Sequence, residues 1–215
     1  RIQVPGFYDD VVPLADAERD AFRKLPFCDD DFRAQIGVDG LTGEEGFSTL
    51  ERRWARPSYD VHGLFAGYQG EGAKTVLPAR AGAKLSFRLV PNQDPEKTTE
   101  SLRQFVGHRI PPGITWELID LHGAPGVIVP LENAHVQAAA RAIERGFGRA
   151  PVFVREGGSI PIVGVFRDQL KAAPLLLGWG LPDDNAHGPN EKFCLADFHR
   201  GIKASAQLWK ELAEC

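Results

Sequence analysis

The segment Arg155-Glu156-Gly157-Gly158-Ser159-Ile160-Pro161 joins an apolar run to a helix-like run. The apolar residues 152–154 predict a short buried strand before it, and the periodicity of 160–170 predicts a helix after it. Its two glycines let the backbone approach a ligand and turn N–H groups toward it. A helix N-terminus behind such a turn favours a carboxylate or a phosphate, so the segment predicts an anion-binding turn.

A second polar segment, Asp183-Asp184-Asn185-Ala186-His187-Gly188-Pro189-Asn190-Glu191, follows another strand-like run at 174–180. It places His187 among polar residues, just ahead of a long helix. Neither segment is decisive by itself, because a Gly-Gly-Ser sequence is often only a turn. A single histidine is also more often structural than a metal ligand. These two segments alone therefore leave open whether the first binds an anion and whether His187 binds a metal.

The composition of the 215 residues excludes several classes of protein. A hydrophobic content of 43% and a charged content of 25% are ordinary for a globular protein. The net charge of −4 offers no basic surface for nucleic acid, and the apolar runs are too short to span a bilayer. The cysteines Cys28, Cys194 and Cys215 contain no closely spaced pair, which indicates a reducing compartment and no disulfide scaffold. Because the chain starts at Arg1 and contains no Met, we expect it to be part of a longer protein.

The first third of the chain predicts short helices. An amphipathic helix near the start would bury Ala17, Phe22 and Leu25. A second helix is expected over 29–36, after an acidic first turn, and a third over 47–54, ended by a proline. These helices carry no evident chemistry, and we expect a structural role for them.

The middle of the chain changes to a two-residue period. Strands are expected over 59–65 and 83–90, and the polar face of the second carries Lys84, Ser86 and Arg88. Asp94 and Pro95 then form a helix N-cap and first turn. A third strand is expected over 114–121. This order of strands and helix is most of a ferredoxin-like α+β unit that lacks its opening strand and helix.

The last part predicts an α/β layer structure with few strands. The residues from 123 to 130 suit a linker, and 131–147 forms an amphipathic helix. The closing helix, 193–212, is expected to bury a stripe of large apolar residues, namely Phe198, Ile202, Leu208, Trp209 and Leu212.

Four ordered motifs carry a resemblance that covers nearly the whole chain. They are Gly70-Glu71-Gly72-Ala73-Lys74-Thr75-Val76-Leu77-Pro78, Phe87-Arg88-Leu89-Val90-Pro91-Asn92, the segment 155–161 and the segment 183–191. With these motifs the chain resembles the dinuclear zinc exopeptidases of the carnosinase and cytosolic non-specific dipeptidase type. These enzymes belong to the acetylornithine deacetylase / succinyl-diaminopimelate desuccinylase / aminoacylase superfamily. The chain aligns with the second half of such enzymes only.

The resemblance implies an α/β protein with an α+β, ferredoxin-like lid. Residues 1–57 would be a helical insertion leading into the lid, and 58–123 the lid, which serves as dimerisation domain. Residues 124–215 would be the C-terminal segment of a phosphorylase/hydrolase-like catalytic sandwich, incomplete in this chain. The implied parent is a cytoplasmic, homodimeric metallopeptidase that hydrolyses dipeptides or short peptides with a metal-activated water.

The resemblance also assigns roles to residues of the motifs. His187 would bind one of two divalent metal ions, which would be zinc or manganese. Asp183 or Asp184 would hold the imidazole of His187 in place by a hydrogen bond; alternatively, both aspartates would only shape the loop. The substrate's C-terminal carboxylate would be bound by Thr75, Arg88, Gly158 and Ser159, with Thr75 acting in its own or the partner subunit's site. Gly158 and Ser159 would bind either that carboxylate or the oxygen of the tetrahedral intermediate. Arg88 could equally pair with a structural carboxylate, and Arg155 and Glu156 would orient the glycine turn.

The family's remaining site residues have no counterpart here. Its first metal-binding histidine, bridging aspartate, glutamate pair and lid histidine are expected to precede Arg1, in the N-terminal catalytic half of the same protein. We therefore expect no catalytic residue in this chain and no activity of it alone. The alternatives are an N-acyl-amino-acid deacylase of the same family and a non-catalytic dimerisation module. A Ser159–His187–Asp183 triad is disfavoured because no nucleophile elbow surrounds Ser159.

Overall fold

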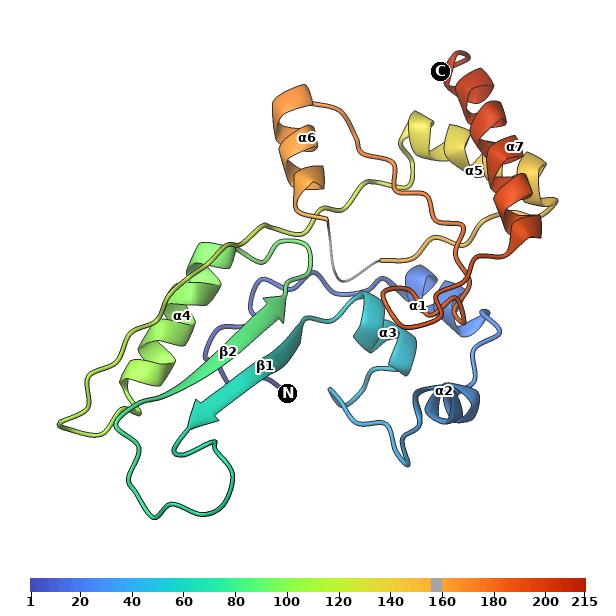
Figure 1. Ribbon diagram of the computed structural model, residues 1–215. Coiled ribbons are helices and arrows are strands. Elements are labelled where there is room, and N and C mark those ends of the chain that lie inside the picture. Colours follow the sequence, from blue (N-terminus) through green and yellow to red (C-terminus); the bar gives the residue numbers. More distant parts are fainter. Residues whose placement is uncertain (156–159) are drawn as a thin grey trace. The chain divides into compact units, whose positions relative to one another are not determined.

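A computed structural model describes residues 1–155 and 160–215 (Figure 1). The described residues form two compact units. Unit 1 comprises Arg1–Val127 and Val154–Pro161, and unit 2 comprises Ile128–Phe153 and Ile162–Cys215. Each unit is described by itself below.

The start of unit 1 is helical, with α1 (Asp16–Arg23), α2 (Asp29–Ile36) and α3 (Thr49–Trp54). Helix α3 begins at a capping box, in which the Ser48 hydroxyl accepts from the Glu51 N–H and the Glu51 carboxylate accepts from the Ser48 N–H. At the start of α1 only half of this arrangement is present, because the Glu18 carboxylate accepts from the Ala15 N–H and alanine has no side-chain acceptor. The helices α1 and α3 pack through the edge-to-face rings of Phe22 and Trp54, whose centroids lie 5.2 Å apart. The predicted helices are confirmed.

The predicted burial of the first helix is only partly correct. Phe22 is buried at 3% exposure, and Leu14 and Ala55 join it in a small core. Leu25 is half-buried, whereas Ala17 is exposed and its predicted burial is wrong. The error arises because α1 has two turns, and only the side that faces α3 is covered.

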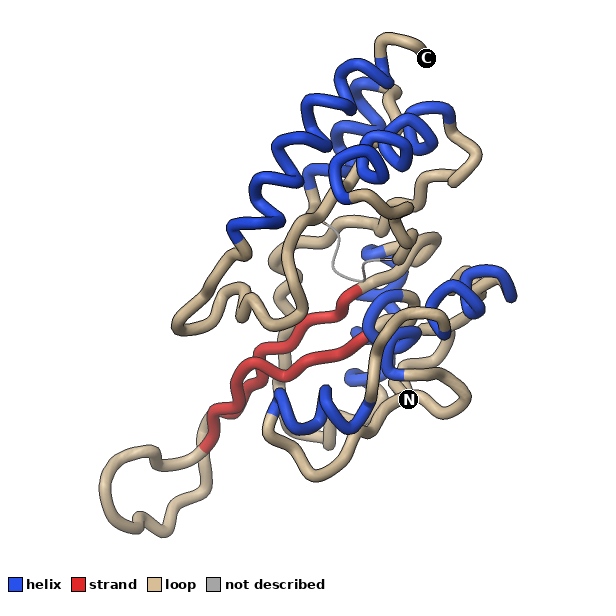
Figure 2. Tube along the Cα trace, turned by 90° about the vertical axis from the view of Figure 1, so that its right-hand side faces the viewer, coloured by secondary structure: helices blue, strands red, loops and turns tan. Residues whose placement is uncertain are grey.

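The sheet of unit 1 is an antiparallel hairpin of β1 (Ser58–Ala66) and β2 (Ala81–Arg88), the only strands among the described residues. Figure 2 shows the two strands side by side, with the long loop 67–80 at one end. Tyr59 pairs with Phe87 and their rings lie 5.1 Å apart, and the adjacent pair, Ser58 with Arg88, closes the end of the hairpin away from the loop. The register shifts between Val61 and Gly63, so His62 is the extra residue of a β-bulge.

Helix α4 (Pro95–Gly107) follows the hairpin and begins as predicted. The Asp94 carboxylate accepts hydrogen bonds from the backbone N–H groups of Glu96 and Lys97, at 2.8 and 3.2 Å. Proline at the first helical position costs no hydrogen bond there, because that N–H has no partner within the helix. The cap and the proline together explain why the start of this helix is predictable from local sequence.

The strand predicted over 114–121 is not formed. This segment runs back along α4 (Figure 1) and contacts it through side chains instead. The Thr99 hydroxyl donates to the Asp120 carboxylate at 3.0 Å, and the indole of Trp116 lies against Gly107. A strand needs a neighbouring backbone to pair with, and among the described residues β1 and β2 already pair with each other.

Unit 2 is built from α5 (Ala134–Phe147), α6 (Ile162–Leu170) and α7 (Leu195–Leu212), of which α5 and α7 pack together. Both helices use small residues at their contact, and the buried ones include Ala138, Ala142, Gly201 and Ala204. A Cβ on Gly146 would lie only 2.7–2.9 Å from the Cβ, N and Cα atoms of Ala204. The two backbones therefore approach each other at a point that admits no further carbon atom.

The predicted buried stripe of α7 is wrong. Phe198, Ile202 and Trp209 are 50, 52 and 76% exposed, while Leu208 and Leu212 are half-buried. The close approach of α5 turns the small residues of α7 inward, and the large apolar residues consequently lie on its exposed side. Exposed apolar side chains of this size mark a surface on which another element of the protein, or a partner, can pack.

Two further predicted strands are absent from the described residues. Residues 152–154 are in no strand of the described structure, with exposures of 49, 38 and 42%. In the run 174–180, Trp179 stacks on Phe147 of α5 at 5.2 Å and lies against Gly201 of α7. The tryptophan thus packs on helices, and a backbone without a pairing neighbour does not become a strand.

The close approach at Gly146 predicts an unusual effect of a glycine-to-alanine change. In an ordinary helix the Gly146→Ala change would stabilise, because alanine has the higher helix propensity. Here we expect a loss of about 1–3 kcal/mol in the free energy of unfolding, because the new methyl group meets the Ala204 backbone. Denaturant unfolding of the protein that carries this chain measures the loss. The matched control is Gly178→Ala, where nothing lies within 4 Å of the new Cβ, and equal effects at both positions would contradict the close approach.

A buried ion-pair cluster between α5 and α7 predicts a pH dependence of stability. Glu211 is 1% exposed, and its carboxylate lies 2.6 Å from Arg141 and 2.6 Å from Arg145. The hydrogen bond from Arg141, with the charges of both arginines, lowers the pKa of Glu211 below its ordinary value. A carboxylate whose folded pKa is depressed stabilises the fold above its unfolded pKa, and this stabilisation is lost as the pH falls through the folded pKa.

We therefore expect the melting temperature of the wild type to fall as the pH decreases below about 4.5, the ordinary pKa of a glutamate. The Glu211→Gln variant should be less stable at pH 7 and should show a smaller change over the same acidic range. Thermal melts of both proteins at a series of pH values measure this difference. Parallel curves for the two proteins would show that Glu211 does not contribute.

Candidate functional site

The side chain of Arg88 is exposed. It lies at the last residue of β2, and no hydrogen bond or ion pair joins it to any residue in the described ranges 1–155 and 160–215. Other arginines of unit 1 do have a carboxylate partner, for example Arg56, whose Nε lies 2.7 Å from Glu44. Of the two interpretations of Arg88, the structural ion pair therefore finds no support within the described part of the chain. An unpaired guanidinium fork can bind a carboxylate through two parallel hydrogen bonds.

A histidine outside the four motifs, His62, contacts the strand that carries Arg88. The Nε2 atom of His62 lies 2.7 Å from the Ser86 Oγ atom. Ser86 precedes Arg88 by two residues on the same strand, so the two side chains project on the same face of β2. The bulge at His62 aims this side chain across the hairpin, and bulges are common beside functional sites. Alternation predicted the face of Ser86 and Arg88, but no local signal predicted the bulge.

Thr75 lies in the loop 67–80 between the strands and is exposed. No hydrogen bond of its side chain is formed within the described part of the chain. The neighbouring Lys74 ammonium stands 5.7 Å from the ring centre of Tyr68, and the Val76 N–H donates to the Lys74 carbonyl at 3.0 Å. The loop thus presents the Thr75 hydroxyl to its surroundings, which is compatible with a ligand or a second chain.

The glycine turn is described only at its edges. Glu156, Gly158 and Ser159, with Gly157, lie outside the described residues, so their predicted roles stay predictions. Arg155, at the start of the turn, is held by Glu18 of α1 through two N–O distances of 2.7 Å. Arg155 is therefore anchored within unit 1, and its predicted role in orienting the turn stays a prediction.

His187 lies in an exposed loop with a backbone φ of +63°, a conformation that residues other than glycine seldom adopt. Its N–H donates to the Glu191 carboxylate at 3.3 Å, and no partner of its imidazole is found in the described ranges. Asn185 and Asn190 also have positive φ, and asparagine adopts this region more readily than most residues. The loop is thus tightly turned and presents the imidazole outward.

The two aspartates before His187 organise this loop. Asp184 is 6% exposed and accepts from the Leu181 N–H at 2.7 Å, and the Lys192 ammonium lies 2.9 Å from Asp183 and 3.4 Å from Asp184. The hydrogen bond from Lys192 lowers the pKa of Asp183, and the same bond raises the pKa of Lys192. Both carboxylates therefore bind Lys192, and neither contacts His187 in the described structure.

The described residues do not by themselves form a metal site. They contain no cluster of three or more histidine, cysteine, aspartate or glutamate side chains that could hold an ion. An exposed imidazole suits a divalent metal, but zinc takes four ligands in structural sites and three protein ligands in catalytic ones. The described part of the chain thus offers His187 as a single candidate ligand.

The candidate residues are distributed over both units. Thr75 and Arg88 belong to unit 1, and His187 belongs to unit 2. Their convergence on one pocket stays a prediction.

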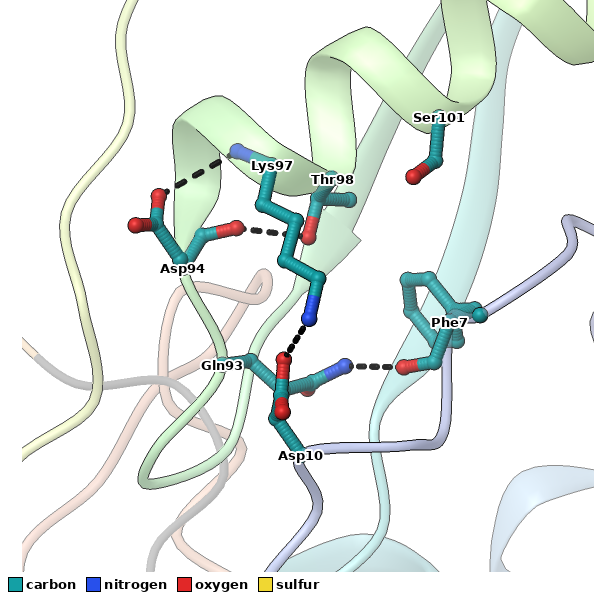
Figure 3. A pocket seen from close by; sticks show the side chains of 8 residues that line it. Phe7, Asp10, Gln93, Asp94, Lys97, Thr98 and Ser101 are labelled. Atoms are coloured by element: carbon teal, nitrogen blue, oxygen red, sulfur yellow. Dashed lines mark hydrogen bonds and ion pairs between the residues drawn. The ribbon is translucent and has the colours of Figure 1, made fainter.

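Two hollows of the described structure contain none of these residues. One lies beside the start of α4 (Figure 3), where Lys97 binds Asp10 and the Gln93 amide donates to the Phe7 carbonyl at 2.7 Å. Its cavity volume of about 10 Å³ is the size of one water molecule, too small for a peptide. The other, of about 250 Å³, lies in the helical start of unit 1 and is lined by Phe22, Leu25, Phe27 and Leu50 among others. Neither is a candidate for the predicted carboxylate site.

No helix in the described part of the chain combines the length and the apolar character needed to cross a membrane.

Comparison with known proteins gives consistent matches over the whole chain. A family model described as peptidase family M20/M25/M40 matches residues 10–211. The Cys-Gly metallodipeptidase dug1 of Schizosaccharomyces pombe is 34% identical over 215 residues, which cover 99% of this chain and 45% of that protein. The human Beta-Ala-His dipeptidase is 30% identical over 217 residues, which cover 99% of this chain and 43% of that protein.

A solved structure supports the same match. The M20 family metallo-carboxypeptidase Sso-CP2 from Sulfolobus solfataricus superposes with a TM-score of 0.83 at 31% identity, and the match covers 98% of this chain and 48% of that one. The chain therefore spans a little less than half the length of the proteins it matches. The motifs that carry the predicted site lie within the matched residues 10–211.

Proposed function

Because this chain belongs to peptidase family M20/M25/M40, we propose that the protein that carries it is a metal-dependent dipeptidase. The family and the named relatives support a metallopeptidase that acts on dipeptides. The observation that carries the proposal is the exposed side chain of Arg88 at the end of β2, which has no partner among residues 1–155 and 160–215 and shares a face with Ser86. A dipeptide always offers a free carboxylate for such a group to bind.

In the proposed site each residue of this chain has one task. Arg88 binds the substrate's C-terminal carboxylate through two hydrogen bonds, and Thr75 adds a third, in its own or the partner subunit's site. Gly158 and Ser159 bind the same carboxylate or the oxygen of the tetrahedral intermediate. His187 supplies one metal ligand. Two divalent ions, zinc or manganese, would supply the activated water, with their remaining ligands contributed from outside this chain.

The proposal includes the assembly of the protein. The exposed apolar side of α7, with Phe198, Ile202 and Trp209, would pack against the N-terminal catalytic half of the same protein. Residues 58–123 would form the lid that dimerises, and 124–215 the C-terminal segment of the catalytic domain, after the helical insertion 1–57. We further propose a cytoplasmic location, on the basis of the three cysteines, which form no disulfide. This chain alone should be inactive.

The reaction is tested with purified full-length protein, reconstituted with zinc or manganese, against two sets of substrates. One set consists of dipeptides, and the other consists of N-acetyl amino acids with the same C-terminal residues. We expect higher kcat/KM for the dipeptides. A preference for the acetylated compounds would instead support the alternative, an N-acyl-amino-acid deacylase, because both reactions need the same carboxylate contact.

The non-catalytic alternative is separated by counting metal ions. A dimerisation module needs no metal, whereas the proposed enzyme should hold about two divalent ions per chain after reconstitution. Metal analysis of the full-length protein measures this number. Fewer than one ion per chain, together with no hydrolysis in either substrate set, would contradict the proposed enzyme.

A further inference from the structure

The end of the β1–β2 hairpin that carries Arg88 is held by buried side chains, whereas the rest of the hairpin is largely exposed. Phe7, near the start of the chain, is buried, and its ring lies 5.2 Å from that of Phe87, the residue next to Arg88. Further along β1, Leu64 and Phe65 are 77 and 50% exposed. The contacts at the buried end therefore fix where Arg88 lies within unit 1.

Gln93 links the end of β2 to the start of the chain (Figure 3). It is 4% exposed, and its side-chain carbonyl accepts from the Val90 N–H at 3.0 Å. Its side-chain amide group donates to the Phe7 carbonyl at 2.7 Å, and its own backbone N–H donates to the Val90 carbonyl at 3.2 Å. Both ends of the side chain thus bind backbone groups, one just after β2 and one in the N-terminal segment.

Neighbouring contacts hold the same turn from two sides. The Asn92 side chain donates to the Asp10 carbonyl at 3.1 Å, and Lys97 of α4 binds the Asp10 carboxylate. On the other side, Pro91 forms a β-bridge with Gly126, and a Cβ on Gly126 would lie only 2.8 Å from the Pro91 N atom. The turn between β2 and α4 is therefore enclosed by the start of the chain and by the segment at Gly126.

The burial of Gln93 limits what it can do. Its amide is covered and is bonded to Val90 and Phe7, so it is a poor candidate for touching a substrate. A buried polar group with its partners in place keeps one geometry and makes its surroundings rigid. Any influence of Gln93 on a ligand must therefore pass through the backbone that it holds.

We propose that Gln93 is a positioning residue for Arg88, which acts by fixing the backbone at the end of β2. This inference rests on the proposed function, which assigns carboxylate binding to Arg88. A bidentate contact depends on orientation, because two N–H groups must point at two carboxylate oxygens, and a shift of about 1 Å weakens it. The inference also gives Phe7 a role in substrate binding that no local pattern indicates.

The test is the Gln93→Met variant of the full-length, metal-reconstituted protein. Methionine is similarly long and flexible but has no amide, so both side-chain hydrogen bonds are lost while the space stays filled. We expect KM for a dipeptide to rise roughly tenfold while kcat changes by less than about threefold, because carboxylate binding is weakened and the metal chemistry is untouched. For the matching dipeptide amide, which lacks the carboxylate, KM should be unchanged.

A double-variant cycle separates positioning from general damage. In the Arg88→Ala background, Gln93→Met should raise KM no further, because the guanidinium that it positions is gone. Phe7→Leu is a milder change, which removes the ring contact with Phe87 and keeps the main-chain carbonyl that Gln93 binds. It should raise KM for the dipeptide roughly threefold, and it decides the question if Gln93→Met does not fold.

The matched control is Phe22→Leu, which lowers the melting temperature through the core between α1 and α3 of the same unit and should leave KM unchanged. The positioning role is wrong, while the dipeptidase stands, if Gln93→Met leaves KM at the value of this control. It is equally wrong if Gln93→Met raises KM as much for the amide, raises it further in the Arg88→Ala background, or cannot be folded and Phe7→Leu leaves KM unchanged. If the wild type hydrolyses no dipeptide, the proposed function fails, and this inference fails with it.

Discussion

Replacing Arg88 by alanine is expected to lower kcat/KM for dipeptides roughly 100- to 1000-fold. Loss of one partner of a desolvated, hydrogen-bonded charge pair costs about 2–5 kcal/mol, and each 1.4 kcal/mol corresponds to a factor of ten. Because Arg88 has no carboxylate partner within the described residues, its removal leaves no unpaired charge behind in this chain. The effect should therefore appear in catalysis, with little change in the melting temperature.

The design separates substrate binding from general damage. Lys84→Ala removes another cation from the same polar face of β2, and it should change kcat/KM by less than about threefold. The Arg88→Lys variant keeps the charge and loses the two-pronged geometry, so its activity should lie between those of the wild type and Arg88→Ala. For a dipeptide amide, Arg88→Ala should have almost no further effect. An equal loss for the acid and the amide would show that Arg88 does not bind the carboxylate.

Replacing His187 by alanine should remove about one of the two expected divalent ions per chain and lower kcat roughly 100- to 1000-fold or more. The reason is that a catalytic zinc site has three protein ligands and does not tolerate the loss of one, and a Lewis-acidic metal contributes several kcal/mol to the barrier. Metal analysis of the full-length protein and steady-state kinetics measure the two effects separately.

The matched control for His187 is His135→Ala, an exposed histidine in the first turn of α5 within the same unit. It should leave both metal content and kcat unchanged. In the chain alone, His187→Ala should alter nothing, because the described residues offer no second ligand beside it. Full metal content in the full-length His187→Ala variant would exclude this histidine as a ligand.

The helices and the hairpin were predictable because their signals are local. The helix at 29–36 was predicted with the bounds that the structure shows, and Asp94 caps the next long helix as its side chain suggests. Alternation over 83–90 correctly placed Ser86 and Arg88 on one face of β2. The four motifs led to the family that the comparison then showed. Caps and periodicity depend on residues at most four positions apart, so one sequence suffices to find them.

The candidate site was predictable only in part. The motifs predicted Thr75, Arg88 and His187, and the structure adds that all three are exposed. The His62–Ser86 contact depends on a β-bulge, and the Glu18–Arg155 pair joins residues 137 positions apart. The Glu18 carboxylate also accepts from the Ala15 N–H, and its pairing with Arg155 is a contact between distant positions that no local pattern contains.

By itself, the sequence determined the helical segments, the β1–β2 hairpin and the peptidase family, because each depends on local spacing or on ordered motifs. Only the tertiary structure decided which apolar runs became strands and which face of α7 was covered. A run such as 114–121 becomes a strand only if another backbone lies beside it, and among the described residues none does. The covered face of α7 follows from the close approach of Gly146 to Ala204, a contact between distant positions that no local pattern contains.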